Sequence, residues 1–149
     1  MKTLSGPMAV AMAITTALMG GCSSTDDTPM SDLEKLQGTW VGEELGRQGE
    51  ARLVFAGNRI DFKGPFPQEW YRGNAVLNEE STPKQADFII SECPMPNYVG
   101  KIAKAIYKLE ESTLTLAGSE PGNESRPVSF DPSGGTRVFQ FKPQSSKQE

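Results

Sequence analysis

Alternation of apolar and polar residues between Thr39 and Lys142 is the feature that most constrains how this chain folds. A period of two places successive side chains on opposite faces of a strand, so that one face can be buried while the other is solvated. Turn-forming residues interrupt the alternation every 8–12 residues or so, roughly the spacing of antiparallel sandwiches and barrels. The strand candidates are Thr39–Leu45, Ala51–Ala56, Arg59–Lys63, Trp70–Asn78, Ala86–Ser91, Ile102–Leu109, Thr113–Ala117 and Thr136–Lys142.

The apolar positions of these strands form one inward set, whereas positions such as Arg52, Asp61 and Gln140 face outward. One half-buried sheet curled on itself accounts for this pattern without a second layer. The sequence therefore predicts an all-β fold, a single antiparallel β-barrel of about eight strands. The expected inward residues are Leu53, Phe55, Ile60, Phe62, Tyr71, Ala75, Leu77, Phe88, Ile90, Ala103, Ala105, Tyr107, Leu109, Leu114, Leu116, Phe139 and Phe141.

A barrel of eight strands is just wide enough to be filled by its own side chains or to hold one small ligand. Because many inward residues are large and the chain is short, we expect a mostly filled interior. The alternative is a small cavity lined by tyrosine hydroxyls. In that case the lining candidates are Phe55, Phe62, Tyr71, Tyr107 and Phe139.

A short helix is predicted before the first strand. Ser31-Asp32-Leu33-Glu34 matches a capping box, in which the Ser31 hydroxyl accepts from the Glu34 N–H and the Glu34 side chain reaches back. Gly38 then supplies a residue at which positive φ can end the helix.

The N-terminal segment predicts export. Lys2 precedes a short apolar run, Pro7 to Met19, which falls short of the ~20 residues that span a bilayer. The run ends in Leu18-Met19-Gly20-Gly21-Cys22, which resembles a bacterial lipobox with Met19 where Leu is more usual. The resemblance implies cleavage, acylation of Cys22 and stable anchoring by several acyl chains. Ser23 favours the outer over the inner membrane, and the alternative is an ordinary secretory signal with an incidental cysteine.

Four parts of the chain are therefore expected. They are a signal peptide (1–21), a lipidated cysteine with a flexible tether (22–30), a barrel domain (31–142) and a disordered tail (143–149). With Cys22 acylated, Cys93 has no partner for an intramolecular disulfide.

The chain contains no histidine, which excludes His-assisted nucleophiles and His-containing zinc or iron sites. We expect no catalysis, no cofactor and no metal.

Cys93 and Met95 supply two soft ligands suited to Cu(I), but the simpler interpretation is a loop thiol near a rigid turn. The adjacent acids Glu43-Glu44, Glu79-Glu80 and Glu110-Glu111 are expected at solvated edges and turns, because neighbouring strand residues face opposite sides.

Charge argues against a nucleic-acid partner. The 15 basic and 19 acidic residues give a net charge of −4, and the basic residues are scattered rather than clustered.

Leu36-Gln37-Gly38-Thr39-Trp40 resembles the G-x-W signature that opens lipocalin-type barrels. The resemblance implies that Gly38 and Trp40 begin the first strand, that Trp40 closes the bottom of the barrel, and that an arginine of the last strand lies across it. Arg137 is the candidate for that arginine, and Lys142 is the substitute.

A wider pattern resembles an uncharacterised lipocalin-like domain family best known from planctomycete bacteria, over about residues 33–142. It departs from that family at Ala105, where Gly is more usual, and it lacks an arginine after the last strand. The resemblance implies a fold and export, but no reaction. The matching stretches are residues 36–40, 53–60, 83–88, 105–117, 126–130 and 136–141.

The preferred functional hypothesis is a membrane-anchored, monomeric lipocalin-like lipoprotein that binds a small apolar ligand or an envelope partner. The alternative is a structural or interaction protein of the cell envelope with a filled barrel, which makes contacts through Glu92–Gly100 and Gly118–Pro127. A His-free enzyme that depends on carboxylates ranks third.

Overall fold

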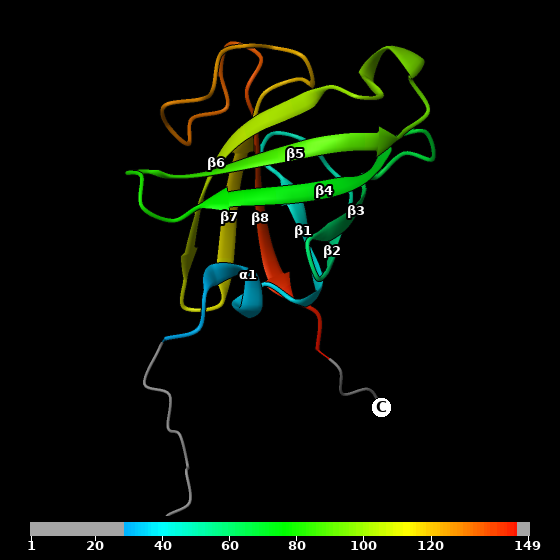
Figure 1. Cartoon of the computed structure of the whole chain (residues 1–149). Helices are drawn as coiled ribbons and strands as arrows, with labels where there is room; N and C mark the ends of the chain where they lie inside the picture. Colours follow the sequence, from blue (N-terminus) through cyan, green and yellow to red (C-terminus); the bar gives the residue numbers. More distant parts are fainter. Residues whose placement is uncertain (1–28, 146–149) are drawn as a thin grey trace, which may run out of the picture.

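The alternating segments pair with their neighbours in chain order, and the first also pairs with the last, so the sheet closes into a barrel (Figure 1). Every pairing is antiparallel. The computed structural model describes residues 29–145, so the expected signal segment and Cys22 lie outside the described residues. Within 29–145 the predicted fold class, an all-β barrel of eight strands with a short N-terminal helix, is confirmed.

All eight predicted strands are present, and their bounds differ from the predicted ones by at most two residues. The last strand continues to Pro143, and the Gln144 N–H donates to the Thr39 carbonyl at 2.8 Å, so the ordered barrel extends beyond the predicted boundary at residue 142. The strands are β1 (Gly38–Glu44), β2 (Ala51–Ala56), β3 (Arg59–Lys63), β4 (Trp70–Asn78), β5 (Lys84–Glu92), β6 (Ile102–Glu110), β7 (Thr113–Gly118) and β8 (Arg137–Pro143).

Closure of the barrel depends on Gly42 in β1. Gly42 pairs with Phe141 of β8, and a Cβ at this position would lie only 1.8 Å from the Gln140 carbonyl oxygen. A glycine in a strand often marks such a close approach of two backbones. Any side chain at residue 42 would therefore push β1 and β8 apart at the seam.

The two ends of the barrel carry different connections (Figure 1). At the end that we call the closed end, strands are joined by residues 57–58, 79–83 and 111–112. At the opposite end, which we call the mouth, strands are joined by residues 45–50, 64–69, 93–101 and 119–136. The 93–101 connection contains the 3₁₀ turn η1 (Pro96–Tyr98).

The helix α1 (Asp32–Lys35) lies across the closed end, where the described N-terminal residues also enter (Figure 1). The predicted capping box is present, since the Glu34 N–H donates to the Ser31 hydroxyl at 3.2 Å and the Ser31 N–H donates to the Glu34 carboxylate at 3.0 Å. The Trp40 indole N–H donates to the Leu36 carbonyl at 2.8 Å, which ties the helix to β1. Among residues 29–145, no helix has the length and apolar character needed to cross a bilayer.

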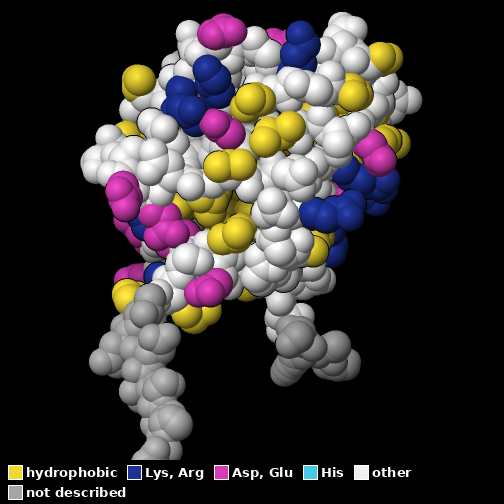
Figure 2. Space-filling model, viewed as in Figure 1, with side chains coloured by type: hydrophobic (Ala, Val, Ile, Leu, Met, Phe, Trp, Pro, Cys, Tyr) yellow, Lys and Arg dark blue, Asp and Glu magenta, His cyan; other side chains and the backbone are white. Residues whose placement is uncertain are grey.

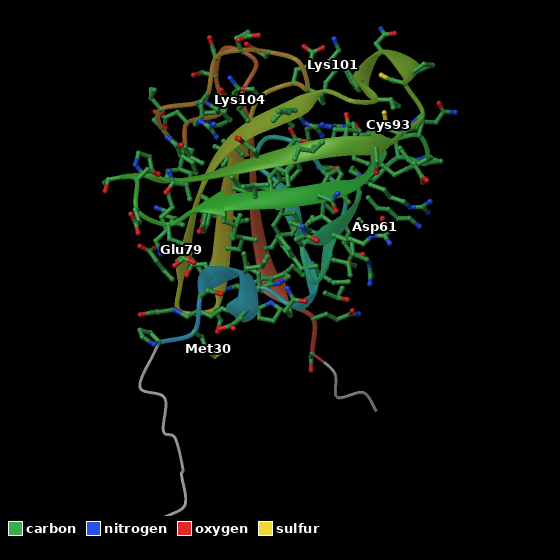
Figure 3. The ribbon with its side chains drawn as sticks, in the orientation of Figure 1. Met30, Asp61, Glu79, Cys93, Lys101 and Lys104 are labelled. Atoms are coloured by element: carbon green, nitrogen blue, oxygen red, sulfur yellow. The ribbon has the colours of Figure 1, made fainter. Side chains whose placement is uncertain are left out.

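An ion-paired carboxylate fixes α1 to the strands. Asp32 is 2% exposed, and its Oδ2 atom accepts from the Lys84 ammonium at 2.8 Å and from the Tyr107 hydroxyl at 2.7 Å. The Asp32 N–H donates to the Glu79 carboxylate at 2.8 Å. In Figure 3, Glu79 lies at this end of the molecule, whereas Cys93 and Lys101 lie at the mouth. Burial raises the pKa of Asp32, but the bonds from Lys84 and Tyr107 outweigh that effect and hold the pKa below its ordinary value.

All the predicted inward residues pack in the main core, either buried or half-buried. The expectation that no second layer exists needs one correction. Ile106, Ala117 and Val138 face outward on adjacent strands and yet are at most 1% exposed, because Phe130 of the 119–136 connection packs against them. Arg126 of the same connection bonds to the Ala86 and Ala105 carbonyls, at 3.2 and 2.9 Å.

Candidate functional site

The mouth half of the barrel contains a cavity of about 350 Å³. Its walls are mainly apolar and come from the inward faces of the strands, and its upper part is bordered by residues of the mouth connections. This volume lies at the lower end of the range for small-molecule sites, roughly 300–1,000 Å³. The lining residues are Leu53, Ile60, Phe62, Tyr71, Phe88, Ile90, Tyr98, Ala103, Ala105, Leu116, Gly118, Ser119, Glu120, Pro121, Gly135, Arg137 and Phe139.

The cavity corrects the expectation of a mostly filled interior. That expectation counted the large inward residues, but it did not weigh where the small ones fall. Ala103, Ala105 and Gly118 face the interior on β6 and β7 near the mouth, and the Gly118 Cα pairs across the sheet with Ala105. Three small residues on adjacent strands leave space that the rings of Phe62 and Phe139, which also border the cavity, do not fill.

Three of the five predicted lining residues, Phe62, Tyr71 and Phe139, border the cavity. The other two do not. Phe55 is buried in the closed half, where it pairs with Gly38, and the Tyr107 hydroxyl is engaged by Asp32. Burial and the bond to Asp32 raise the pKa of Tyr107 far above its ordinary value. These two aromatics therefore hold the closed end together instead of bordering the cavity.

The predicted contact of Arg137 with Trp40 is wrong. Trp40 lies at the start of β1, at the closed end, where it pairs with Pro143, whereas Arg137 begins β8 at the mouth. Parity along β8 correctly indicates that Arg137 faces inward, but six residues of extended strand separate it from Pro143, about 20 Å at the usual rise. Gly38 and Trp40 do begin β1, as expected, and Trp40 is 4% exposed at the closed end.

Arg137 instead forms a half-buried ion pair with Glu44, the last residue of β1. Its Nε donates to Glu44 Oε2 at 3.0 Å and its Nη2 donates to Glu44 Oε1 at 2.7 Å, a bidentate geometry. Arg47 donates to Glu44 at 2.9 Å and to Glu69 at 3.1 Å. Burial raises the pKa of Glu44, but the bonds from Arg137 and Arg47 hold it below its ordinary value. The bond to Glu44 likewise raises the pKa of Arg137, which therefore stays charged.

Glu44 also corrects the expectation that the acid pairs lie at solvated edges. It is 8% exposed, while its neighbour Glu43 faces outward. The alternation of the first strand indicates an inward Glu44 side chain, because Glu44 has the same parity as Trp40 and Gly42. The other two pairs, Glu79-Glu80 and Glu110-Glu111, are exposed as expected, although Glu79 accepts from the Asp32 N–H.

Two mouth connections meet above the cavity. The Tyr98 hydroxyl of η1 donates to the Glu120 carboxylate at 2.5 Å, and both residues border the cavity. This bond raises the pKa of Tyr98 to about 12, so its hydroxyl is protonated at neutral pH. The Tyr98 ring lies 6.3 Å from the Tyr71 ring, which continues the aromatic wall to the rim. Neither residue 98 nor residue 120 belongs to an alternating segment, so the sequence offered no signal for their placement.

Cys93 lies beside the mouth, half-buried against the core, and its thiol donates to the Met95 carbonyl at 3.1 Å. The Met95 side chain is 49% exposed. Figure 3 shows the Cys93 sulfur beside the ribbon at the end of β5. Within residues 29–145, no group of three or more Cys, Asp or Glu residues is placed to hold a metal ion.

Comparisons with known proteins give no further guide: no protein-family model, curated protein or solved structure matches this chain.

Proposed function

We propose that this protein is a membrane-anchored binding protein that holds a small apolar molecule inside a lipocalin-like barrel. The observation that carries the proposal is the cavity of about 350 Å³ with mainly apolar walls at the mouth of a closed barrel. Binding sites for small molecules are typically concave and apolar with a few placed polar groups, and this cavity has Tyr71, Ser119 and Arg137 in its lining. The proposal includes membership of the lipocalin-like family that the sequence resembles, and no catalytic role.

The position of the termini supports anchoring through Cys22. The described chain enters the barrel beside α1, at the end opposite the cavity (Figure 1). A lipid on Cys22 would hold the closed end toward the membrane and leave the mouth facing away from it. On the face shown in Figure 2, apolar side chains are interspersed with acidic and basic ones. We assign attachment to the acyl chains on Cys22.

Ligand binding is tested with a substitution of a lining residue that fills the cavity. We expect decane to raise the urea midpoint of the full chain, because a ligand that binds only the folded state stabilises it. Ala103→Phe, which projects a ring into the cavity, should abolish this increase. Val76→Phe is the matched control, because it enlarges an outward residue of β4 that is 54% exposed. Equal increases in both variants, or none in the natural chain, would refute ligand binding in this cavity.

Anchoring is tested separately. Cys22→Ser should shift the protein from the membrane fraction to the soluble fraction of cells, whereas Cys93→Ser should leave it in the membrane fraction. Membrane attachment that survives Cys22→Ser would rule out the lipid anchor.

A second candidate, an envelope interaction protein, is favoured by exposed apolar side chains on the mouth connections. Phe66 is 54%, Met95 49% and Val99 46% exposed. Contacts made through residues 92–100 would give one dominant cross-linked partner in cells. That product should disappear when Met95 and Val99 are replaced by Ser.

A further inference from the structure

The cavity contains polar groups that the barrel itself leaves without hydrogen-bond partners. Arg137 uses Nε and Nη2 to bind Glu44, but no hydrogen bond within residues 29–145 engages its Nη1 atom. The Tyr71 hydroxyl likewise has no hydrogen-bond partner in this part of the chain, although the Tyr71 ring is half-buried and borders the cavity. Both atoms are accessible to solvent, so water can satisfy them until a ligand acceptor replaces it.

These two donors flank one aromatic wall. The Tyr71 ring lies 6.0 Å from the Phe62 ring, which lies 5.3 Å from the Phe139 ring, and the Arg137 guanidinium carbon lies 5.2 Å from the centre of the Phe139 ring. Both Tyr71 and Arg137 border the same cavity. Burial raises the pKa of Tyr71, and the nearby Arg137 charge lowers it in part. Because the net pKa is raised, the Tyr71 hydroxyl remains a donor at neutral pH.

The charges around the site are already balanced. The cations of Arg137 and Arg47 are matched by the carboxylates of Glu44 and Glu69, with Glu69 at 3.7 Å from Arg137 and 3.1 Å from Arg47. Glu120 adds a further carboxylate to the cavity lining. A ligand carboxylate would meet this negative charge without an uncompensated cation in return.

We propose that the cavity selects neutral apolar molecules with one hydrogen-bond acceptor, such as an ester or ketone, held by the Tyr71 hydroxyl and Arg137 Nη1, and disfavours fatty-acid anions. This inference rests on the proposed function and specifies its ligand class. Tyr71 and Arg137 bind the head group, Glu120 opposes anions, and the apolar wall holds the chain.

The test compares three probes that share an eight-carbon chain: methyl octanoate, octanoate and octane. The full chain is placed in phosphatidylcholine vesicles, each probe is titrated, and affinity is obtained from the rise of the urea midpoint. Vesicles of the same composition that contain the Ala103→Phe variant correct for partitioning. We expect methyl octanoate to bind most tightly, better than octane by about fivefold for each of the two hydrogen bonds and better than octanoate by about tenfold.

Variants separate the head-group contacts from the cavity itself. Tyr71→Phe should weaken the binding of methyl octanoate about fivefold and leave the affinity for octane unchanged. Tyr107→Phe is the matched control, since its hydroxyl bonds to Asp32 at the closed end and does not border the cavity, and it should leave the ester-to-octane ratio unchanged. Glu120→Gln should strengthen octanoate binding severalfold without affecting octane.

The outcomes distinguish the two proposals. If none of the three probes stabilises the natural chain, ligand binding itself fails. If all three bind equally, or if octanoate binds best, the cavity is a binding site but its selectivity for neutral acceptors is refuted. An unchanged ester affinity in Tyr71→Phe also refutes the assigned head-group contact.

Discussion

At the closed end of the barrel, short turns join the strands, α1 lies across the opening, and buried polar atoms such as the Asp32 carboxylate and the Tyr107 hydroxyl bond to each other. At the mouth, longer connections join the same strands, small residues leave a cavity, and donors on Arg137 and Tyr71 lack partners within residues 29–145. One end therefore has its buried polar atoms paired, whereas the other has a cavity, where we propose that the ligand binds. Departures from complete packing and complete hydrogen bonding are commonly found at functional sites.

The largest expected difference lies between two phenylalanines of β8 that face the same interior. Phe141 is fully buried toward the closed end, while Phe139 borders the cavity. Phe141→Ala should lower the free energy of unfolding by about 4 kcal/mol, because it removes a ring that is packed on all sides. Phe139→Ala should cost about half as much, roughly 2 kcal/mol, since part of its surface already lacks contacts. Urea unfolding followed by circular dichroism measures both values, and equal losses would contradict a hollow mouth.

The polar cluster at the closed end offers the next test. Asp32→Ala should cost about 2–3 kcal/mol, because it leaves the buried Tyr107 hydroxyl and the Lys84 ammonium without their acceptor. In a double-mutant cycle with Tyr107→Phe, the combined loss should be smaller than the sum of the single losses. Additive losses would mean that the two groups do not interact.

Acid should destabilise both ends of the barrel. Substitution of Asp32 at the closed end and of Glu44 at the mouth separates the contribution of each carboxylate to this loss of stability. The pKa of Asp32 and the pKa of Glu44 lie below their ordinary values of 3.8 and 4.5. Carboxyls with a lowered pKa stabilise the fold fully above those values, and this stabilisation is lost as the pH falls through the folded pKa. The urea midpoint should therefore fall below pH 4.5. Asp32→Asn and Glu44→Gln should each flatten part of this decline, and an unchanged pH profile in both variants would contradict these assignments.

The smallest expected effect concerns the turn between β6 and β7. Glu111 and Ser112 adopt positive φ values of 50° and 66°, a region that costs L-residues energy. Glu111→Asn with Ser112→Gly matches the sequence preference of such a two-residue turn and should raise the free energy of unfolding by roughly 0.5–1 kcal/mol. The same urea experiment detects the gain. Ligand affinity at the mouth should not change, which provides the control.

The sequence by itself determined the strands, their inward face and the capped helix, because these depend on local periodicity and on bonds between near neighbours. Residues 51–56, 59–63 and 70–78 form strands with the predicted bounds, and the Ser31–Glu34 box forms as expected. Parity alone placed Phe62, Tyr71 and Phe139 inside the barrel.

Only the tertiary structure decided how far along the barrel each inward residue lies. Parity assigns a face but not a depth. Tyr107 and Arg137 both face inward as predicted, yet Arg137 lies at the end opposite Trp40 and Tyr107 lies away from the cavity. The register of β1 against β8, set by the close approach at Gly42, places Glu44 beside Arg137. The cavity arises where small residues of the β6–β7 hairpin face the same interior as side chains of β3, β4 and β8, an arrangement that only closure of the barrel produces.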